Sequence, residues 1–250
     1  MFINKMRRKE VLNHLTWIDL LSVTAILFGY FIYASSIYFL STLDSSSNLN
    51  QEILDTTNFT SADDWGNLKI QSVFLIIALL YLWFRRYNFK QLPIYFRWNV
   101  IWLAPAIFLF IGLSSDVFIS IFGDYNYFNF SDLQLFDFSL GTTFGHVSNL
   151  MASAVIYGLF NGFYEEFYFL GLLTSVKEKY RWPVLLFSTI VRTSFHTYQG
   201  FMYSIAIGVV AGLLYYILYK YKVKNLLPFF IAHAFADFFG SSFLYLFIPY

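Results

Sequence analysis

The sequence predicts an all-α fold, a polytopic bundle of transmembrane helices. Of its 250 residues, 58% are hydrophobic and only 12% are charged, and the mean hydropathy is +0.57. A soluble domain carries roughly 25% charged residues, about twice this share. Several apolar runs also exceed the roughly 18 residues that mark a membrane-spanning helix. We therefore expect the chain to lie in a lipid bilayer.

Apolar runs between charged segments predict about seven spans. These spans cover residues 17–40, 69–84, 98–122, 145–176, 183–199, 201–219 and 225–249. The first run is too long for the hydrophobic part of a secretory signal, and no small-residue cleavage site follows it. We interpret it as a retained helix. The alternative to seven spans is an eighth, short or re-entrant segment within 123–144.

The basic residues predict the orientation of the chain. Fourteen of the 16 basic residues fall on one side of the seven-span scheme, namely Lys5, Arg7, Arg8, Lys9, Arg85, Arg86, Lys90, Arg97, Lys177, Lys179, Arg181, Lys220, Lys222 and Lys224. Segments 41–68 and 123–144 carry acidic residues and no basic ones. The positive-inside rule then places the N-terminus in the cytoplasm and these two segments outside. Seven spans put the C-terminus outside, and we expect a multi-pass protein of the cell membrane.

We divide the chain into an N-terminal region of three spans with external loops, 1–144, and a core of four spans, 145–250. The core contains two small-xxx-small patterns, Gly158 to Gly162 and Gly208 to Gly212, which let helix backbones approach closely. The chain has no cysteine, so disulfides and thiolate catalysis are excluded. A net charge of +1 without a large basic patch argues against a nucleic-acid partner.

Polar residues deep in three core spans are the candidate functional site. They are Glu165, Glu166, Arg192, His196, His233 and Asp237. Each ionisable side chain at the bilayer centre costs several kcal/mol, so we expect all six to face one another inside the bundle. Two pairs, Arg192 with His196 and His233 with Asp237, are four residues apart and share a helical face. By contrast, Asp19 and Asp116 lie near span ends and are expected to reach the headgroups.

These residue types indicate two alternative chemistries. Burial and a like-charged neighbour raise the pKa of a carboxyl group, while a nearby cation lowers it, so such a group can take a proton from water. With histidines as a second base or as oxyanion donors, this is the outline of amide hydrolysis by water. Alternatively, His196, His233 and a carboxylate hold a zinc ion. The zinc alternative lacks its usual motif, because no H-E-x-x-H is present.

Three segments of the core resemble a known family. The segments "EEFYFLG" at 165–171, "RTSFHTYQG" at 192–200 and "NLLPFFIAHAFADFFG" at 225–240 are similar to the three motifs of the CAAX-protease and bacteriocin-processing family, also called CPBP or Abi. The family pattern is EE-x-x-x-R, then F-x-x-x-H, then H-x-x-x-N or H-x-x-x-D. The resemblance covers residues 145–250, and the first 144 residues resemble no family that we can name.

The resemblance implies an all-helical intramembrane endopeptidase with a glutamic mechanism and no metal. Glu165 with His196 would activate water, Glu166 would assist or orient, and His233 with Asp237 would hold the oxyanion. Members of the family process peptide pheromones and bacteriocin leaders or give self-immunity to bacteriocins. The sequence departs from the pattern twice, since Leu170 replaces the motif arginine and Arg192 replaces the usual phenylalanine.

The two departures lead to one hypothesis, that Arg192 supplies from a neighbouring helix the cation that is missing at Leu170. Two readings compete with the protease. One is a catalytically idle relative that binds a peptide or a bacteriocin receptor. The other is a small transporter whose polar cluster is an ion path, which the lack of an inverted repeat disfavours.

Overall fold

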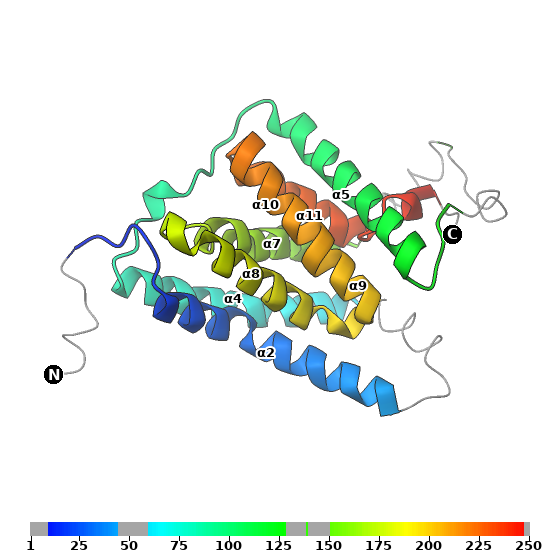
Figure 1. Ribbon diagram of the computed structural model, residues 1–250, viewed down its shortest axis with the longest axis horizontal. Coiled ribbons are helices and arrows are strands. Elements are labelled where there is room, and N and C mark those ends of the chain that lie inside the picture. The colour runs from blue at the N-terminus through cyan, green and yellow to red at the C-terminus, as the bar shows by residue number, and fades with distance from the viewer. Residues whose placement is uncertain (1–9, 45–59, 129–138, 140–150, 248–250) are drawn as a thin grey trace.

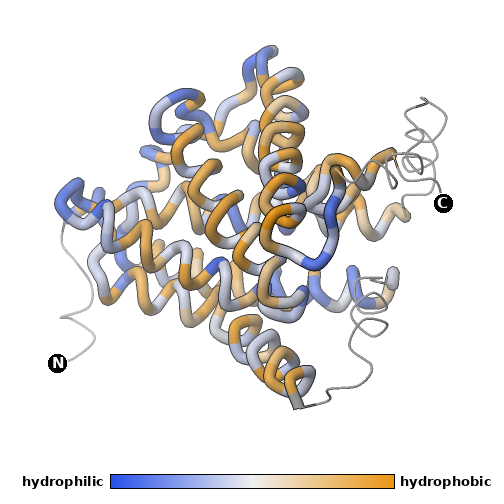
Figure 2. The backbone as a smooth tube through the Cα atoms, turned by 45° about the vertical axis from the view of Figure 1, so that its right-hand side comes forward, coloured by the Kyte–Doolittle hydropathy of each residue, from blue (hydrophilic) through white to orange (hydrophobic). Residues whose placement is uncertain are grey.

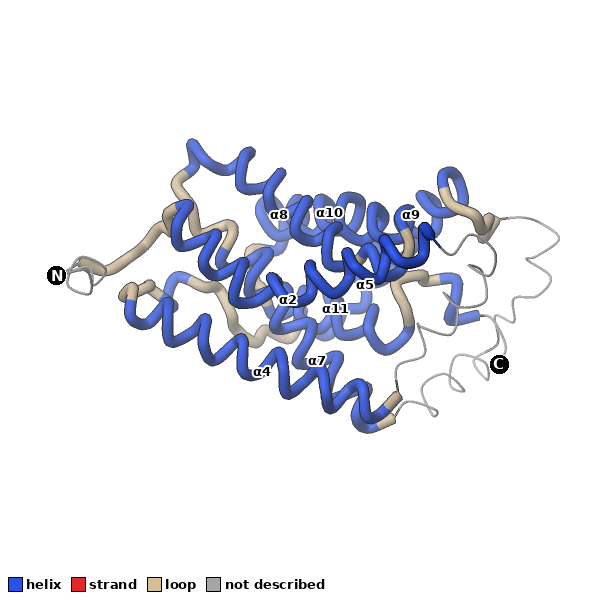
Figure 3. Tube along the Cα trace, turned by 90° about the horizontal axis from the view of Figure 1, so that it is seen from below, coloured by secondary structure: helices blue, strands red, loops and turns tan. Residues whose placement is uncertain are grey.

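A computed structural model describes residues 10–44, 60–128, 139 and 151–247, and within these ranges the chain forms helices, turns and one isolated bridge between Leu12 and Tyr87. The expected all-α bundle is confirmed (Figure 3). The predictions for the basic residues before Glu10, for the acidic residues in 45–59, for Asp132 and Asp137 and for the C-terminus fall outside these ranges.

Four long helices form the periphery of the bundle. They are α2 (Trp17–Asp44), α4 (Ser61–Phe84), α5 (Val100–Phe122) and a composite helix from α9 (Phe201–Ile205) through η6 (Ala206–Ala211) and α10 (Gly212–Leu218) to η7 (Tyr219–Val223). Each is long and apolar enough to cross a membrane, and at most 39% of its most apolar window is buried inside the protein. Their other faces are therefore available to lipid, and hydrophobic residues run along them in Figure 2.

Three shorter helices complete the bundle (Figure 1). These are α7 (Ala152–Glu166), which continues as a π-helical turn η3 (Phe167–Leu172), α8 (Arg181–Phe195) and α11 (Leu227–Phe239). In the described part of the chain, four helices are long and apolar enough to be candidate spans, and these three are not among them. The number of seven spans therefore stays a prediction. The helices that fall short are the ones that carry the polar residues.

The last helix is shorter than the sequence predicts. Residues 225–249 were expected to form one span, but α11 ends at Phe239 after 13 residues, which is about 20 Å of helix. The physical reason is Gly240, which has a φ of 87°, a left-handed conformation that ends the helix. The chain then turns back into η8 (Leu244–Phe247), where the backbone N–H groups of Phe243 and Leu244 donate to Asp116 Oδ2 of α5.

The basic connections gather at one end of the bundle, at the left of Figure 1. Leu15 N–H donates to the Ser175 carbonyl at 2.8 Å, and Leu226 N–H donates to the Pro93 carbonyl at 2.8 Å, so the segments before α2, before α5, before α8 and before α11 touch. Burial raises the pKa of Tyr87 in this layer, where its hydroxyl bonds to Ser175 Oγ at 2.7 Å. The basic segments therefore lie together at one end of the bundle, as the predicted orientation requires. Which side of the membrane this end faces stays a prediction.

Two glycine patterns mark the closest helix contacts, as predicted. A Cβ added at Gly162 would lie 2.9 Å from Ala234 N of α11, and one at Gly158 would collide with Phe238. In the second pattern, a Cβ at Gly208 would lie 2.6 Å from Thr193 N of α8. The small residues thus let α7 approach α11 and let η6 approach α8.

Asp19 and Asp116 do not reach headgroups, contrary to the prediction. Asp19 is fully buried and pairs with Arg85 at 2.7 Å, while Tyr81 and Thr16 also donate to it. Asp116 is buried against the turn after α11. Asp19 accepts from a cation and Asp116 accepts from backbone N–H groups inside the protein. These donors replace the water that each carboxylate loses on burial.

Candidate active site

The two glutamates lie at the end of α7, directly before the π turn. Glu165 is 4% exposed and Glu166 is fully buried. A π turn adds a residue to the helical repeat and is found frequently at functional sites. Here η3 follows Glu166 at once and carries the buried residues Phe169 and Leu170. The sequence places the glutamates one turn after Gly162, at the closest approach of α7 to α11.

One carboxylate oxygen of Glu166, on α7, contacts both α8 and α11. This oxygen, Oε1, accepts from Arg192 Nη2 of α8 at 2.8 Å and bonds to His233 Nδ1 of α11 at 2.8 Å. Arg192 is 3% exposed, and its guanidinium carbon lies 4.1 Å from the centroid of the Phe169 ring. A buried ion pair with further hydrogen bonds and an aromatic face is well compensated for its loss of hydration.

This ion pair confirms the geometric part of the hypothesis about the two departures. A cation from α8 does reach Glu166, through the single nitrogen Arg192 Nη2. Leu170 is 2% exposed and lines the same small cavity as Arg192. The side chain of residue 170 therefore points to the region where the guanidinium lies.

Glu165 has one oxygen held and one oxygen without a partner. Its Oε1 accepts from Asn161 Nδ2 at 3.2 Å, one helical turn earlier on α7. Its Oε2 is buried and has no hydrogen-bond partner in the described part of the chain. His233 Nε2 lies 3.7 Å from Oε2, and Asp237 Oδ1 lies 3.8 Å from the same nitrogen. Both distances are too long for a direct hydrogen bond and suit a bridging water.

His196 closes α8, and its ring orientation is defined. Its Nδ1 bonds to the backbone carbonyl of Arg192 at 2.8 Å. Because a carbonyl oxygen only accepts, Nδ1 carries the proton, and Nε2 of the neutral ring keeps a lone pair for a proton. The turn η5 (Thr197–Gln199) that follows is held from α2, since Tyr198 N–H donates to Ser35 Oγ at 2.9 Å.

Among the residues described, no group of three or more His, Asp or Glu side chains is arranged to hold a metal ion. We derive no step through a metal.

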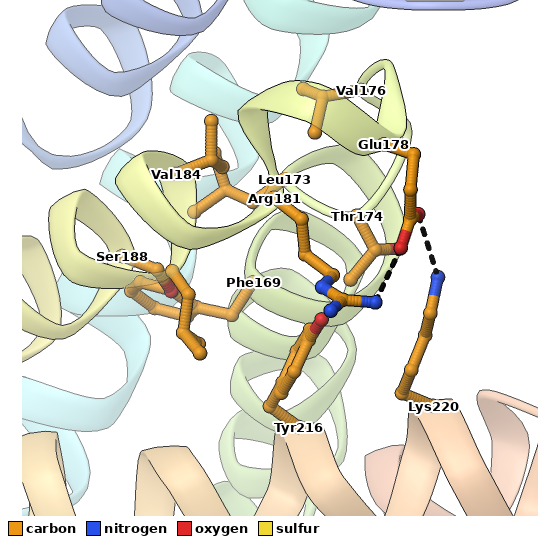
Figure 4. Close-up of a pocket in the computed structure, with 11 residues that line it drawn as sticks. Phe169, Leu173, Thr174, Val176, Glu178, Arg181, Val184, Ser188, Tyr216 and Lys220 are labelled. Carbon is orange, nitrogen blue, oxygen red and sulfur yellow. Dashed lines mark hydrogen bonds and ion pairs between the residues drawn. The ribbon is translucent and has the colours of Figure 1, made fainter.

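A cavity lies beside this site, at the basic end of the bundle (Figure 4). Glu178 bridges its rim, because it pairs with Arg181 of α8 and with Lys220 of η7. A second small cavity shares Phe169 and Tyr216 with the first and reaches Arg192. Of the six candidate residues only Arg192 lines either cavity, so the two cavities and the carboxylate cluster are separate features.

Five of the six candidate residues are joined by direct contacts of 3.8 Å or less, namely Glu165, Glu166, Arg192, His233 and Asp237. His196 is tied to them through the backbone of Arg192. Sequence reasoning missed Gln71 of α4, whose Nε2 donates to Asn161 Oδ1 at 2.8 Å. A single glutamine in a predicted span was the available signal.

The geometry can be compared with known proteins. Residues 147–239 match the family model described as type II CAAX prenyl endopeptidase Rce1-like, and this segment contains all six candidate residues. The match covers most of the C-terminal core, which is therefore similar to the CAAX protease family. No curated protein and no solved structure matches the chain significantly.

The match supports protease activity of the CAAX type in general for the matched segment. Residues 10–44 and 60–128 lie outside the matched segment, yet Ser35 and Gln71 from these ranges contact the site. The boundary at residue 144 between two regions stays a prediction, since both sides contribute to one hydrophobic core.

Proposed function

We propose that this chain is an intramembrane endopeptidase that hydrolyses a peptide bond with water activated by Glu165 and His196. The observation that carries the proposal is Glu165 Oε2, a buried carboxylate oxygen without a hydrogen-bond partner in the described chain, 3.7 Å from His233 Nε2. A group of this kind, in a segment that matches a CAAX protease, is suited to take a proton from water. The cellular role that we propose is the maturation of a peptide or bacteriocin, or self-immunity, at the cell membrane.

The proposed reaction needs one base and one oxyanion donor. Glu165 Oε2 takes a proton from water as the water oxygen bonds to the carbonyl carbon of the substrate. His196 assists through Nε2, because its Nδ1 is occupied by the Arg192 carbonyl. In its protonated form His233 offers Nε2–H to the developing oxyanion, while Nδ1 stays on Glu166. The carbon–nitrogen bond then breaks, and the proton passes from Glu165 to the leaving amine.

Glu166, Arg192 and Asp237 hold this arrangement in the proposed mechanism. Glu166 orients His233, and Arg192 compensates the charge of Glu166. Asp237 Oδ2 accepts from Asn161 at 3.1 Å, so this carboxylate aligns Asn161 beside Glu165. We propose that no metal takes part.

Purified protein in lipid nanodiscs tests the proposal. The probe is an internally quenched peptide that ends in a farnesylated cysteine followed by three residues, and the same peptide without the lipid is the second arm. Cleavage of either peptide, located by mass spectrometry and retained after exhaustive chelation, is the expected result. Glu165→Ala and His196→Ala should abolish it, whereas Glu178→Ala, at an exposed ion pair, should not. A cellular phenotype that survives Glu165→Ala would instead favour a catalytically idle binding protein.

A further inference from the structure

Asn161 lies between two carboxylates of the site. Its Nδ2 donates to Glu165 Oε1 at 3.2 Å and to Asp237 Oδ2 at 3.1 Å. An amide nitrogen carries two hydrogens, so one can serve each carboxylate. The same contacts decide which oxygens remain for chemistry, because Glu165 Oε2 and Asp237 Oδ1 are left facing His233 Nε2. Asn161 thus selects the reactive oxygen of Glu165.

The orientation of the Asn161 amide needs a further donor. If the amide turned over, its Oδ1 would face two carboxylates and both hydrogen bonds would be lost. Gln71 adds a third contact that fixes the amide, since its Nε2 donates to Asn161 Oδ1 at 2.8 Å. The same Nε2 lies 3.4 Å from the hydroxyl of Tyr157, which stands one turn before Asn161 on α7. Both amides are buried, with 5% of Gln71 and 6% of Asn161 exposed.

We propose that Gln71 is a positioning residue for the peptidase reaction, and that it acts through Asn161 to keep Glu165 Oε2 turned toward the substrate. This inference rests on the proposed function. It assigns a role to α4, which lies outside the segment that matches the CAAX protease family. Among the residues described, the donor that fixes the Asn161 amide comes from α4 and not from the helices of the matched segment.

A substitution series on α4 tests the proposal with the peptide probe that wild-type protein cleaves. Gln71→Leu removes the donor and keeps the volume similar, so Asn161 Oδ1 loses its partner and the amide can shift away from its position between the carboxylates. We expect kcat to fall about 10- to 100-fold, since a displacement of about 1 Å in a catalytic group costs on this order. KM should stay within about twofold, because Gln71 has no role in binding the substrate. Gln71→His restores a donor and should recover part of kcat.

Leu75→Ala is the matched control on the same helix. Leu75 lies one turn later on α4, is 7% exposed and contributes only apolar packing. Its truncation costs about 2–5 kcal/mol of stability. We expect Leu75→Ala to lower the unfolding temperature more than Gln71→Leu and to leave kcat of the folded enzyme near the wild-type value.

The proposal and the proposed function fail in different ways. If Glu165→Gln is inactive and Gln71→Leu has wild-type kcat, the peptidase mechanism stands and the role of Gln71 is overturned. If kcat falls equally in Gln71→Leu and Leu75→Ala in proportion to stability, Gln71 is merely structural and the proposal is also overturned. A fall in kcat for Gln71→Leu alone, with partial recovery in Gln71→His, supports it.

Discussion

Arg192 Nη2 lies 2.8 Å from Glu166 Oε1, and this buried ion pair links α8 to α7 at the end where α7 becomes a π turn. The family motif places an arginine on the same helix as the glutamates, at the position of Leu170. In this chain the cation comes from a neighbouring helix and packs on the Phe169 ring. The pair places one cation beside Glu166, as the hypothesis of compensation requires.

Loss of this cation should inactivate the enzyme as severely as loss of Glu165. Arg192→Leu leaves Glu166 as a buried anion with His233 as its remaining partner, and breaking such a pair costs about 3–5 kcal/mol. Adding Leu170→Arg should restore part of the activity, because residue 170 lines the same cavity as Arg192. The measurement is kcat of folded protein in nanodiscs.

The control for this series is Arg181→Leu, which removes an arginine from a more exposed ion pair at the start of the same helix. Near-normal activity in Arg192→Leu would show that Arg192 only fills space beside Phe169. Failure of Leu170→Arg to restore any activity, with the double variant folded, would remove the idea of compensation.

The glycine contacts make a prediction about stability. Gly208→Ala places a methyl group 2.6 Å from Thr193 N, which is backbone and cannot move aside alone. Overpacking of this kind costs about 1–3 kcal/mol. Gly29→Ala is the control, since nothing lies within 4 Å of a Cβ there, and alanine in a helix is favoured over glycine by about 1 kcal/mol. Thermal unfolding should move in opposite directions for the two variants, and equal shifts would contradict the packing described.

Ser35 should affect the turn that follows His196. Its hydroxyl accepts from Tyr198 N–H at 2.9 Å and bonds to Thr197 Oγ1 at 2.9 Å. Ser35→Ala leaves a partly buried N–H without this partner, at a cost of about 1 kcal/mol, and loosens η5. We expect a lower kcat with a small change in stability. Ser36→Ala is the matched control on α2, and an equal loss of activity in both variants would show that η5 is not the cause.

The arrangement of the basic connections predicts topology. Reporters inserted at Lys90 and at Lys222 should report the same side, because the two segments meet through Leu226 and Pro93. The positive-inside rule makes that side cytoplasmic. A reporter after Tyr250, which lies outside the described residues, is expected outside the cell. Opposite locations for Lys90 and Lys222 would contradict the bundle itself, whereas a cytoplasmic C-terminus would point to an eighth or re-entrant segment.

The convergence of the polar residues was accessible from sequence because two simple quantities determine it. Residues four apart, such as His233 and Asp237, share a face, and ionisable groups inside a membrane must find partners. Depth along each span then places Glu165, Arg192 and His233 at a similar level. None of these steps requires knowledge of which helices are neighbours.

The contacts that the sequence did not predict each depend on a partner that is distant in sequence. Gln71 reaches Asn161, which is 90 residues away, and Asp19 pairs with Arg85, which is 66 residues away. No periodicity reveals such pairs. The early end of α11 was more accessible, because "FFGSS" after Asp237 contains a glycine followed by two serines, a typical sign that a helix ends.

The central claim is that Glu165 is the base, and the most direct measurement is kcat for Glu165→Gln on the cleaved peptide probe. Glutamine keeps the size of the side chain and an oxygen for Asn161 Nδ2, but it cannot take a proton from water. The account predicts a fall in kcat of at least about 100-fold, the lower range for a general base, with an unchanged unfolding temperature. A folded Glu165→Gln enzyme with kcat within a few-fold of wild type would contradict the account.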